Sequence, residues 1–103
     1  MRIFSIYDNQ KPVECVVNEN EFSSILFVNV HYCRPGESRT IHSHEDREEI
    51  FICFQGRGTV ITDEGEIKIS RGDVLIFKPG ESHGFESDEV DPLAYICIAI
   101  KEK

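Results

Sequence analysis

Residues 36–56 read GESRTIHSHEDREEIFICFQG, and this stretch decides the fold. Two histidines, His42 and His44, stand two positions apart, and Glu49 follows five positions after the second. A strand turns residues i and i+2 to the same face, with Cβ atoms roughly 6–7 Å apart. Two imidazoles at that spacing can therefore bind one metal ion, and a carboxylate on the next strand can reach the same point.

The composition suits one folded domain. The chain has 103 residues, of which 40% are hydrophobic, and this is enough for a single modest core. We therefore expect one domain over residues 1–103. The seven glycines and four prolines fall between apolar runs, which is typical of short strands joined by turns.

The charge argues against two classes of partner. The chain carries 19 acidic and 11 basic residues and a net charge of -8. Nucleic acids and anionic membranes both attract basic stripes or segments, so we expect neither as a partner. The acidic residues gather in 45–49, 63–66 and 86–91, which we interpret as solvated loops.

The cysteines and the N-terminus indicate a cytoplasmic protein. No CxxC pair occurs among Cys15, Cys33, Cys53 and Cys97. The chain begins Met-Arg-Ile-Phe-Ser without an apolar signal segment. No apolar run approaches the ~18–20 residues that span a bilayer. Free, mostly buried thiols in the cytosol are the simplest interpretation.

Short apolar or alternating runs recur between turn residues and predict about ten strands. These runs cover residues 2–7, 13–17, 24–34, 39–44, 49–54, 59–62, 66–69, 74–77, 82–86 and 93–100. No helical periodicity extends beyond one or two turns. The pattern predicts a small all-β sandwich or barrel.

The last predicted strand, residues 93–100, is apolar on both faces. The outer face of an isolated two-sheet sandwich should be polar. Another segment or another subunit must therefore cover it, and we favour a homodimer that packs strands face to face or edge to edge.

A second stretch, residues 72–83, reads GDVLIFKPGESH and places a histidine after a strand and a glycine-containing turn. Together the two stretches resemble the cupin superfamily. The first motif of that family has Gly, five residues, His-x-His, three or four residues, Glu, six residues and Gly. This sequence fits that motif at Gly36, His42, His44, Glu49 and Gly56.

The second cupin motif has Gly, five residues, Pro-x-Gly, two residues, His, three residues and Asn. Gly72, Gly80 and His83 fit it, whereas Lys78 replaces the Pro and Ser87 replaces the Asn. Neither replaced position is a metal ligand in the family. The motifs at 36–56 and 72–87 imply an antiparallel double-sheet jelly-roll β-barrel.

The resemblance also implies a metal site inside the barrel, with the ligands His42, His44, Glu49 and His83. Three imidazoles and one carboxylate suit Fe, Mn, Ni, Co, Cu or Zn as a divalent ion. A closed structural zinc site would more often use cysteines, so the site is expected to keep positions open for a small molecule. Glu48 is the alternative to Glu49, because the family also allows the shorter spacer.

Several other residues are candidates for the pocket. His31 is either an exposed or hydrogen-bonded strand residue or an acid/base group beside the metal. A catalytic group can also come from Tyr32 or Tyr95, and nothing in the sequence singles one out. Thr40 shares the strand parity of the two motif histidines and so faces the same way.

The remaining candidates are interpreted as packing residues. We expect Cys53 and Cys97 in the core. Aromatic side chains are expected to fill the barrel mouth, namely Phe51, Phe77 and Phe85.

Two functions fit these patterns. The first is a small-molecule metalloenzyme of the dioxygenase or isomerase type. The second is a non-catalytic cupin module that binds or senses a small ligand. Because one barrel hosts many chemistries, the fold does not decide between them.

Overall fold

The computed structural model describes residues 1–7 and 11–101, which contain nine strands and no helix. The strands are Val13–Val17 (β1), Ile25–Tyr32 (β2), Ser38–His42 (β3), Arg47–Gln55 (β4), Arg57–Thr62 (β5), Gly65–Ser70 (β6), Val74–Phe77 (β7), His83–Ser87 (β8) and Ala94–Lys101 (β9). In the same described residues, nothing helical is long and apolar enough to cross a bilayer.

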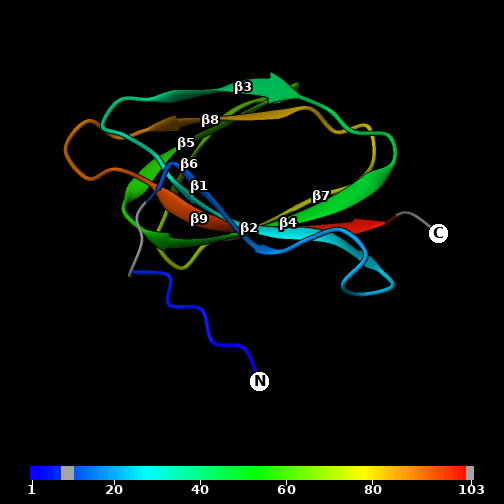
Figure 1. Ribbon diagram of the computed structural model, residues 1–103. Coiled ribbons are helices and arrows are strands. Elements are labelled where there is room, and N and C mark those ends of the chain that lie inside the picture. The colour runs from blue at the N-terminus through cyan, green and yellow to red at the C-terminus, as the bar shows by residue number, and fades with distance from the viewer. Residues whose placement is uncertain (8–10, 102–103) are drawn as a thin grey trace.

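The strands form two sheets that face each other (Figure 1). One sheet has five strands in the order β1-β2-β9-β4-β7, and the other has four in the order β3-β8-β5-β6. Neighbouring strands pair antiparallel in both sheets. The chain is therefore an all-β antiparallel jelly roll, as the sequence predicts.

Alternation along β4 and β9 builds the inner face of the five-stranded sheet. Glu49, Phe51 and Cys53 of β4 are buried and pair in register with Ala99, Cys97 and Tyr95 of β9. Successive side chains of a strand point to opposite faces, so these residues all point between the sheets. The neighbouring isoleucines of both strands point outward.

The main core lies between the two sheets. Its buried members are Cys33, Phe51, Cys53, Val60, Ile69, Phe77, Phe85, Leu93, Tyr95 and Cys97. The predicted packing roles of Cys53 and Cys97 are confirmed. Phe51 also packs edge-on against Phe77, with ring centroids 5.6 Å apart.

The predicted strand over residues 2–7 is wrong, because the structure has no strand there. Phe4 and Ile6 instead pack against the outer face of the five-stranded sheet, over a cluster formed by Val30, Tyr32 and Ala94. Their alternating apolar pattern reflects contact with a sheet face and not strand pairing. The break expected after this segment lies partly at residues 8–10, outside the described residues.

The N-terminal segment covers part of the apolar outer face to which the last strand contributes. Phe4 and Ile6 pack against the same buried cluster as Ile96, so a segment of the same chain covers part of that face. The rest of the face ends at β7, where Val74 and Ile76 are 55% and 63% exposed.

Candidate metal centre

Two histidines meet across the pairing of β3 with β8. His42 is the last residue of β3 and pairs with His83, the first residue of β8. A register shift lies between Arg39 and His42 within β3. The strand ends at His42 and not at His44 as predicted, because its partner β8 begins at His83. The ring centroids of His42 and His83 lie 4.6 Å apart.

His44 and Glu49 complete the group from the other side. The His44 ring lies 4.7 Å from the His42 ring and 6.4 Å from the His83 ring. The ligand atoms of His42, His44 and Glu49 all lie within 4.8 Å of one another. His83 is not one of these three, but its Nε2 lies 3.2 Å from Glu49 Oε1.

The tautomers of two histidines suit a metal ion. His42 Nδ1 lies 2.9 Å from the carbonyl oxygen of Thr40, and His83 Nδ1 lies 3.3 Å from that of Glu81. Because a carbonyl oxygen can only accept, Nδ1 carries the hydrogen in both rings. Each neutral ring then presents the lone pair of Nε2, which is the arrangement that metal-binding histidines usually adopt.

His83 gives the strongest indication of a cation. Its side chain is 1% exposed, and its Nε2 has no hydrogen-bond partner among the described residues. The 3.2 Å contact with Glu49 Oε1 lacks hydrogen-bond geometry and brings two acceptors together. Such a buried contact needs a proton or a metal cation between the two atoms. The residues therefore fit a divalent metal ion.

Glu49 is held as a carboxylate. Burial acts to raise its pKa, but a proton on His83 Nε2, the Cys97 thiol and the charge of His44 outweigh burial and lower the pKa below its usual value. A metal cation in place of that proton would act in the same direction. The Cys97 thiol donates to Glu49 Oε2 over 3.5 Å. Burial and the charge of Glu49 raise the pKa of Cys97, so the thiol stays protonated and remains a donor.

The structure separates Glu49 from its alternative. The Glu49 side chain is 6% exposed. Glu48 points the other way, is 34% exposed, and forms an ion pair with Lys78 at the surface. Glu49 is therefore the carboxylate that faces the histidines.

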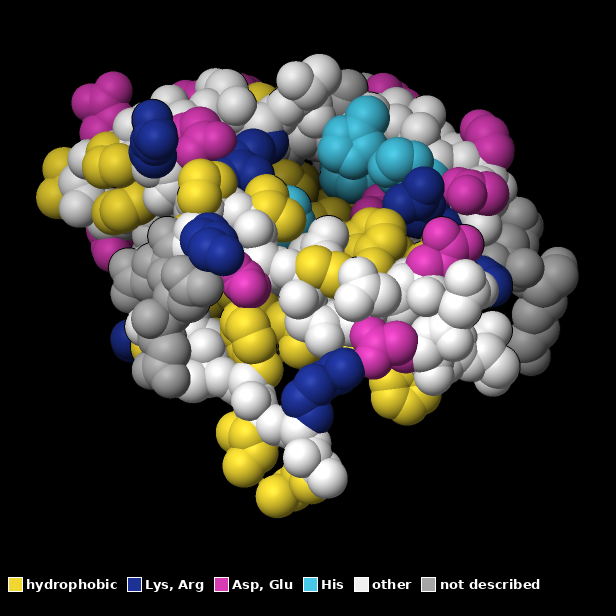
Figure 2. Space-filling view, in the orientation of Figure 1, with side chains coloured by type: hydrophobic (Ala, Val, Ile, Leu, Met, Phe, Trp, Pro, Cys, Tyr) yellow, Lys and Arg dark blue, Asp and Glu magenta, His cyan; other side chains and the backbone are white. Residues whose placement is uncertain are grey.

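A pocket of about 310 Å³ adjoins the cluster. Its walls carry aromatic side chains, namely Phe27, Phe51, Phe85 and Tyr95. Beyond the metal-binding group, its polar side chains are Asn29, His31, Arg39, Thr40 and Arg47. Figure 2 shows histidine side chains gathered beside a hollow, with cationic side chains close to it.

The sequence candidates divide between pocket and core. His31 and Tyr95 line the pocket, and their rings stack 4.8 Å apart. The suggestion that Tyr32 could supply a catalytic group is wrong, because its side chain belongs to the outer-face cluster on the other side of the sheet. Phe77 does not line the pocket but stacks on His83 at 4.2 Å.

Sequence reasoning missed three polar pocket residues, Asn29, Arg39 and Arg47. Strand parity offers a signal for two of them. Asn29 shares the face of His31, and Arg47 shares the face of Glu49. Arg39 offers no such signal, because the register shift in β3 breaks the alternation.

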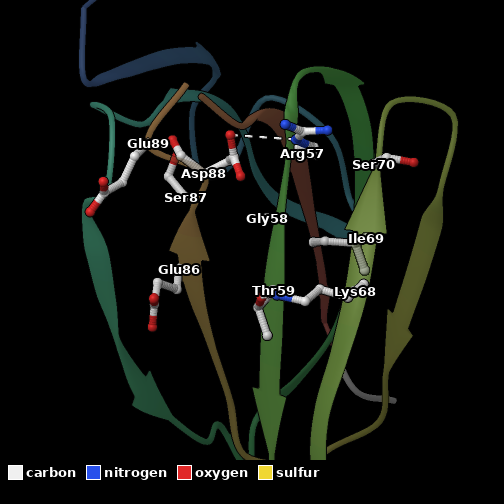
Figure 3. Close-up of a pocket in the computed structure, with 10 residues that line it drawn as sticks. All are labelled: Arg57, Gly58, Thr59, Lys68, Ile69, Ser70, Glu86, Ser87, Asp88 and Glu89. Atoms are coloured by element: carbon white, nitrogen blue, oxygen red, sulfur yellow. Dashed lines mark hydrogen bonds and ion pairs between the residues drawn. The ribbon is translucent and has the colours of Figure 1, made fainter. Parts of the chain in front are cut away.

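A larger hollow of about 630 Å³ lies elsewhere, on the outer face of the four-stranded sheet (Figure 3). Its polar groups are paired in part. Lys68 Nζ donates to Thr59 Oγ1 over 3.1 Å, and Arg57 Nε lies 3.4 Å from Asp88 Oδ2. Among the described residues, no histidine or cysteine lines this hollow, so the histidine cluster and the smaller pocket form the candidate site.

The fold and the cluster together define a jelly-roll barrel with a candidate metal centre between its sheets. The sequence pattern of the cupin domain family matches residues 30–99. The chain belongs to that family.

Solved structures share this fold. A Klebsiella pneumoniae protein with a double-stranded β-helix domain is 22% identical, with a TM-score of 0.84 over 100% of this chain and 99% of that one. KdgF from Halomonas is 19% identical, with a TM-score of 0.75 over 88% and 78%. A Thermotoga maritima protein described as a predicted oxalate decarboxylase is 21% identical, with a TM-score of 0.70 over 87% and 92%.

One curated relative is an uncharacterised protein of Methanocaldococcus jannaschii. It is 29% identical over 64 residues, which cover 62% of this chain and 51% of that protein. The match therefore spans about half the length of the relative.

Proposed function

We propose that this cupin holds one divalent transition metal ion, Fe, Mn, Ni, Co, Cu or Zn, and binds a small molecule in the adjoining pocket. The proposed ligands are His42, His44, Glu49 and His83. The observation that carries the proposal is the buried contact between His83 Nε2 and Glu49 Oε1, two acceptor atoms that a cation would join.

A metal ion bound there would supply a Lewis acid and a fixed point of attachment for the small molecule. The chain's own residues set the surroundings. Glu49 contributes a negative charge, and the Cys97 thiol holds its second oxygen. Phe51, Phe85 and Tyr95 limit water in the pocket.

The catalytic form of this proposal is a metalloenzyme of the dioxygenase or isomerase type. A non-catalytic binding or sensing module is the second candidate, and one observation favours it. Burial and the nearby Arg39 charge lower the pKa of His31 to about 4, and burial raises that of Tyr95. Neither group is then ready to exchange a proton near neutral pH.

Elemental analysis of the purified protein tests the metal site. We expect about one metal ion per chain, strong loss of metal in His83→Ala and Glu49→Gln, and wild-type metal content in Glu48→Gln. The last variant is the matched control, because it removes the same charge from the neighbouring residue on the outer side. Metal content unchanged in His83→Ala would contradict the four-ligand proposal.

Turnover measurements separate the two candidate functions. Protein loaded with Fe(II), Mn(II) or Ni(II) is assayed for oxygen uptake and product formation across a panel of small acids and sugars. Metal-dependent turnover lost in His83→Ala supports the enzyme. Tight binding without turnover by any metal form supports the binding module.

We further propose that two copies associate through the open half of the five-stranded sheet's outer face. In the register of this sheet, Ile76 of β7 pairs with Ile50 of β4, which pairs with Ile98 of β9. A parallel row runs from Val74 to Ile52 and ends at Ile96, where the N-terminal segment packs. The strip is uncharged in a chain of net charge -8, so two copies can meet there without bringing carboxylates together.

The proposed compartment is the cytoplasm. All four cysteines are free, and Cys33, Cys53 and Cys97 are buried thiols within the core. Free thiols of this kind are typical of proteins in a reducing compartment. Localisation of a tagged protein in cell fractions tests this.

A further inference from the structure

The pocket contains polar side chains that the proposed metal site does not use. Asn29 and His31 come from β2, Arg39 from β3 and Arg47 from the start of β4. They lie on strands that bring them to the same cavity as the metal cluster. Their chemistry indicates what kind of small molecule the cavity accepts.

Arg39 is held in place at the edge between the two sheets. Its Nε lies 2.6 Å from Glu37 Oε2. Its Nη1 lies 3.2 Å from His31 Nδ1, and its Nη2 donates to the carbonyl of Tyr32 over 3.4 Å. A guanidinium has five N–H donors, so these contacts leave donors for a ligand while fixing the plane of the group.

His31 is a neutral donor in this arrangement. Arg39 can only donate, so His31 Nδ1 accepts and the hydrogen of the neutral ring lies on Nε2. Burial first, and then the charge of Arg39, lower the pKa of His31 to about 4. The ring therefore adds a hydrogen-bond donor but no charge at neutral pH.

Arg47 supplies a second guanidinium. Its side chain is 21% exposed, and its Nε lies 3.2 Å from Asp46 Oδ1. The guanidinium carbon lies 5.6 Å from the centre of the Phe27 ring, a cation–π contact that orients the group. Because Asp46 is 68% exposed, this ion pair is screened by water and leaves Arg47 available.

Asn29 adds an unused polar group. Its Oδ1 is buried without a hydrogen-bond partner among the described residues. A buried amide oxygen in that state is costly. This oxygen needs a donor, so it would pair with a hydroxyl or N–H group on the body of a bound molecule and not with a carboxylate.

The charges of the pocket favour an anion. Among the residues that line it, Arg39 and Arg47 are cationic and Glu49 is the one carboxylate. This contrasts with a net charge of -8 for the whole chain. Glu37 and Asp46 offset part of the two guanidinium charges. A divalent ion at the histidines would make this region net cationic, and a cationic cleft concentrates small anions.

We propose that the pocket binds a small organic carboxylate, with Arg47 as its principal charged contact and Arg39 as a second. The planar guanidinium fork matches a carboxylate. The aromatic walls suit an organic body better than inorganic phosphate, and about 310 Å³ is at the small end of ligand pockets. This inference deepens the proposed small-molecule function of the same site.

Binding of matched probes tests the inference. Pyruvate, malonate and benzoate are compared with pyruvamide, malonamide and benzamide, and with inorganic phosphate, by calorimetry and ligand-observed NMR. We expect at least one acid to bind more tightly than its amide and than phosphate. We expect Arg47→Gln to weaken that acid by roughly tenfold or more.

Arg57→Gln is the matched control, because it removes the same charge from the outer hollow and should leave the affinity unchanged (Figure 3). Arg47→Lys separates charge from fork geometry and should recover only part of the affinity. Equal affinity for acid and amide, tighter binding of phosphate, or an unchanged affinity in Arg47→Gln would each overturn the inference.

The metal proposal and this inference fail separately. Each titration is run on metal-loaded and on chelator-treated protein, with metal content measured for every variant. Arg47-dependent binding of an acid to a chain that takes up no metal when metal is supplied would refute the metal site and leave the carboxylate site standing. Full metal content with affinity independent of Arg47 would refute the carboxylate site alone.

Discussion

Among the glycines, Gly56 leaves the least room for a side chain beside a neighbouring backbone segment. It has a φ of +70°, and a Cβ placed there would lie 1.9 Å from the carbonyl oxygen of Pro92. Gly36 has a similar φ of +69°, but its Cβ would meet only the Glu89 side chain at 3.2 Å. The two motif glycines thus share a backbone requirement and differ in their surroundings.

We predict a larger loss of stability for Gly56→Ala than for Gly36→Ala. Left-handed backbone costs an alanine about 1–2 kcal/mol, and this applies to both variants. The Pro92 carbonyl is backbone and cannot move aside as the Glu89 side chain can, so Gly56→Ala adds overpacking of about 1–3 kcal/mol. Urea unfolding measures both. Equal losses would show that close approach at Gly56 is unimportant.

His31 links folding to pH. Its pKa is about 4 in the folded chain, below the ordinary value near 6.5. The unfolded chain therefore binds the proton first as pH falls, and stability is lost between pH 6.5 and about 4. The charged groups that act on His31 are Arg39, Glu49 and Glu37.

His31→Asn should remove that pH dependence. The amide oxygen keeps an acceptor for Arg39 and does not titrate. From pH 7.5 to pH 5, we expect wild type to lose on the order of 2 kcal/mol more unfolding free energy than the variant. Urea titrations of both proteins in the presence of a chelator measure this difference. The other histidines contribute equally to the two proteins, so their effect cancels. Parallel losses in the two proteins would contradict the assignment.

At the level of elements, periodicity predicted most strands because side-chain alternation is a local property. The span of β7 was predicted as observed, and β8 and β9 are displaced by one residue from their predicted spans. The strand predicted over residues 2–7 is wrong for a physical reason. A segment that lies across a sheet face can carry the same alternation as a strand, since Phe4 and Ile6 face the sheet in turn.

The candidate site was predictable where a motif fixes residue type and spacing together. His42 and His83 meet because β3 and β8 pair in register. His44 follows β3, and β4 of the opposite sheet brings Glu49 to the same point. The rest of the pocket depends on three-dimensional detail. The register shift in β3 hides the inward direction of Arg39, and the face of Tyr32 follows from sheet membership that a sequence does not state.

At the scale of the whole molecule, the two faces of the five-stranded sheet differ in what covers them. The inner face carries the core and the pocket. On the outer face the N-terminal segment covers Val30 and Ala94, whereas Ile76 at the other end is 63% exposed. Ile67 on β6 of the other sheet is similarly exposed, at 60%, but stands outside the apolar rows.

We predict that Ile76→Asp converts a dimer to a monomer, whereas Ile67→Asp leaves the mass unchanged. In a face-to-face dimer, the new carboxylate would be buried against isoleucines and its counterpart, which costs several kcal/mol. Light scattering over a hundredfold range of concentration gives the mass of each protein, and urea unfolding verifies that both variants fold. A wild-type chain that stays monomeric throughout would eliminate the dimer. Dissociation of the Ile67 variant alone would move the interface to the four-stranded sheet, because each substitution adds the same charge at similar exposure.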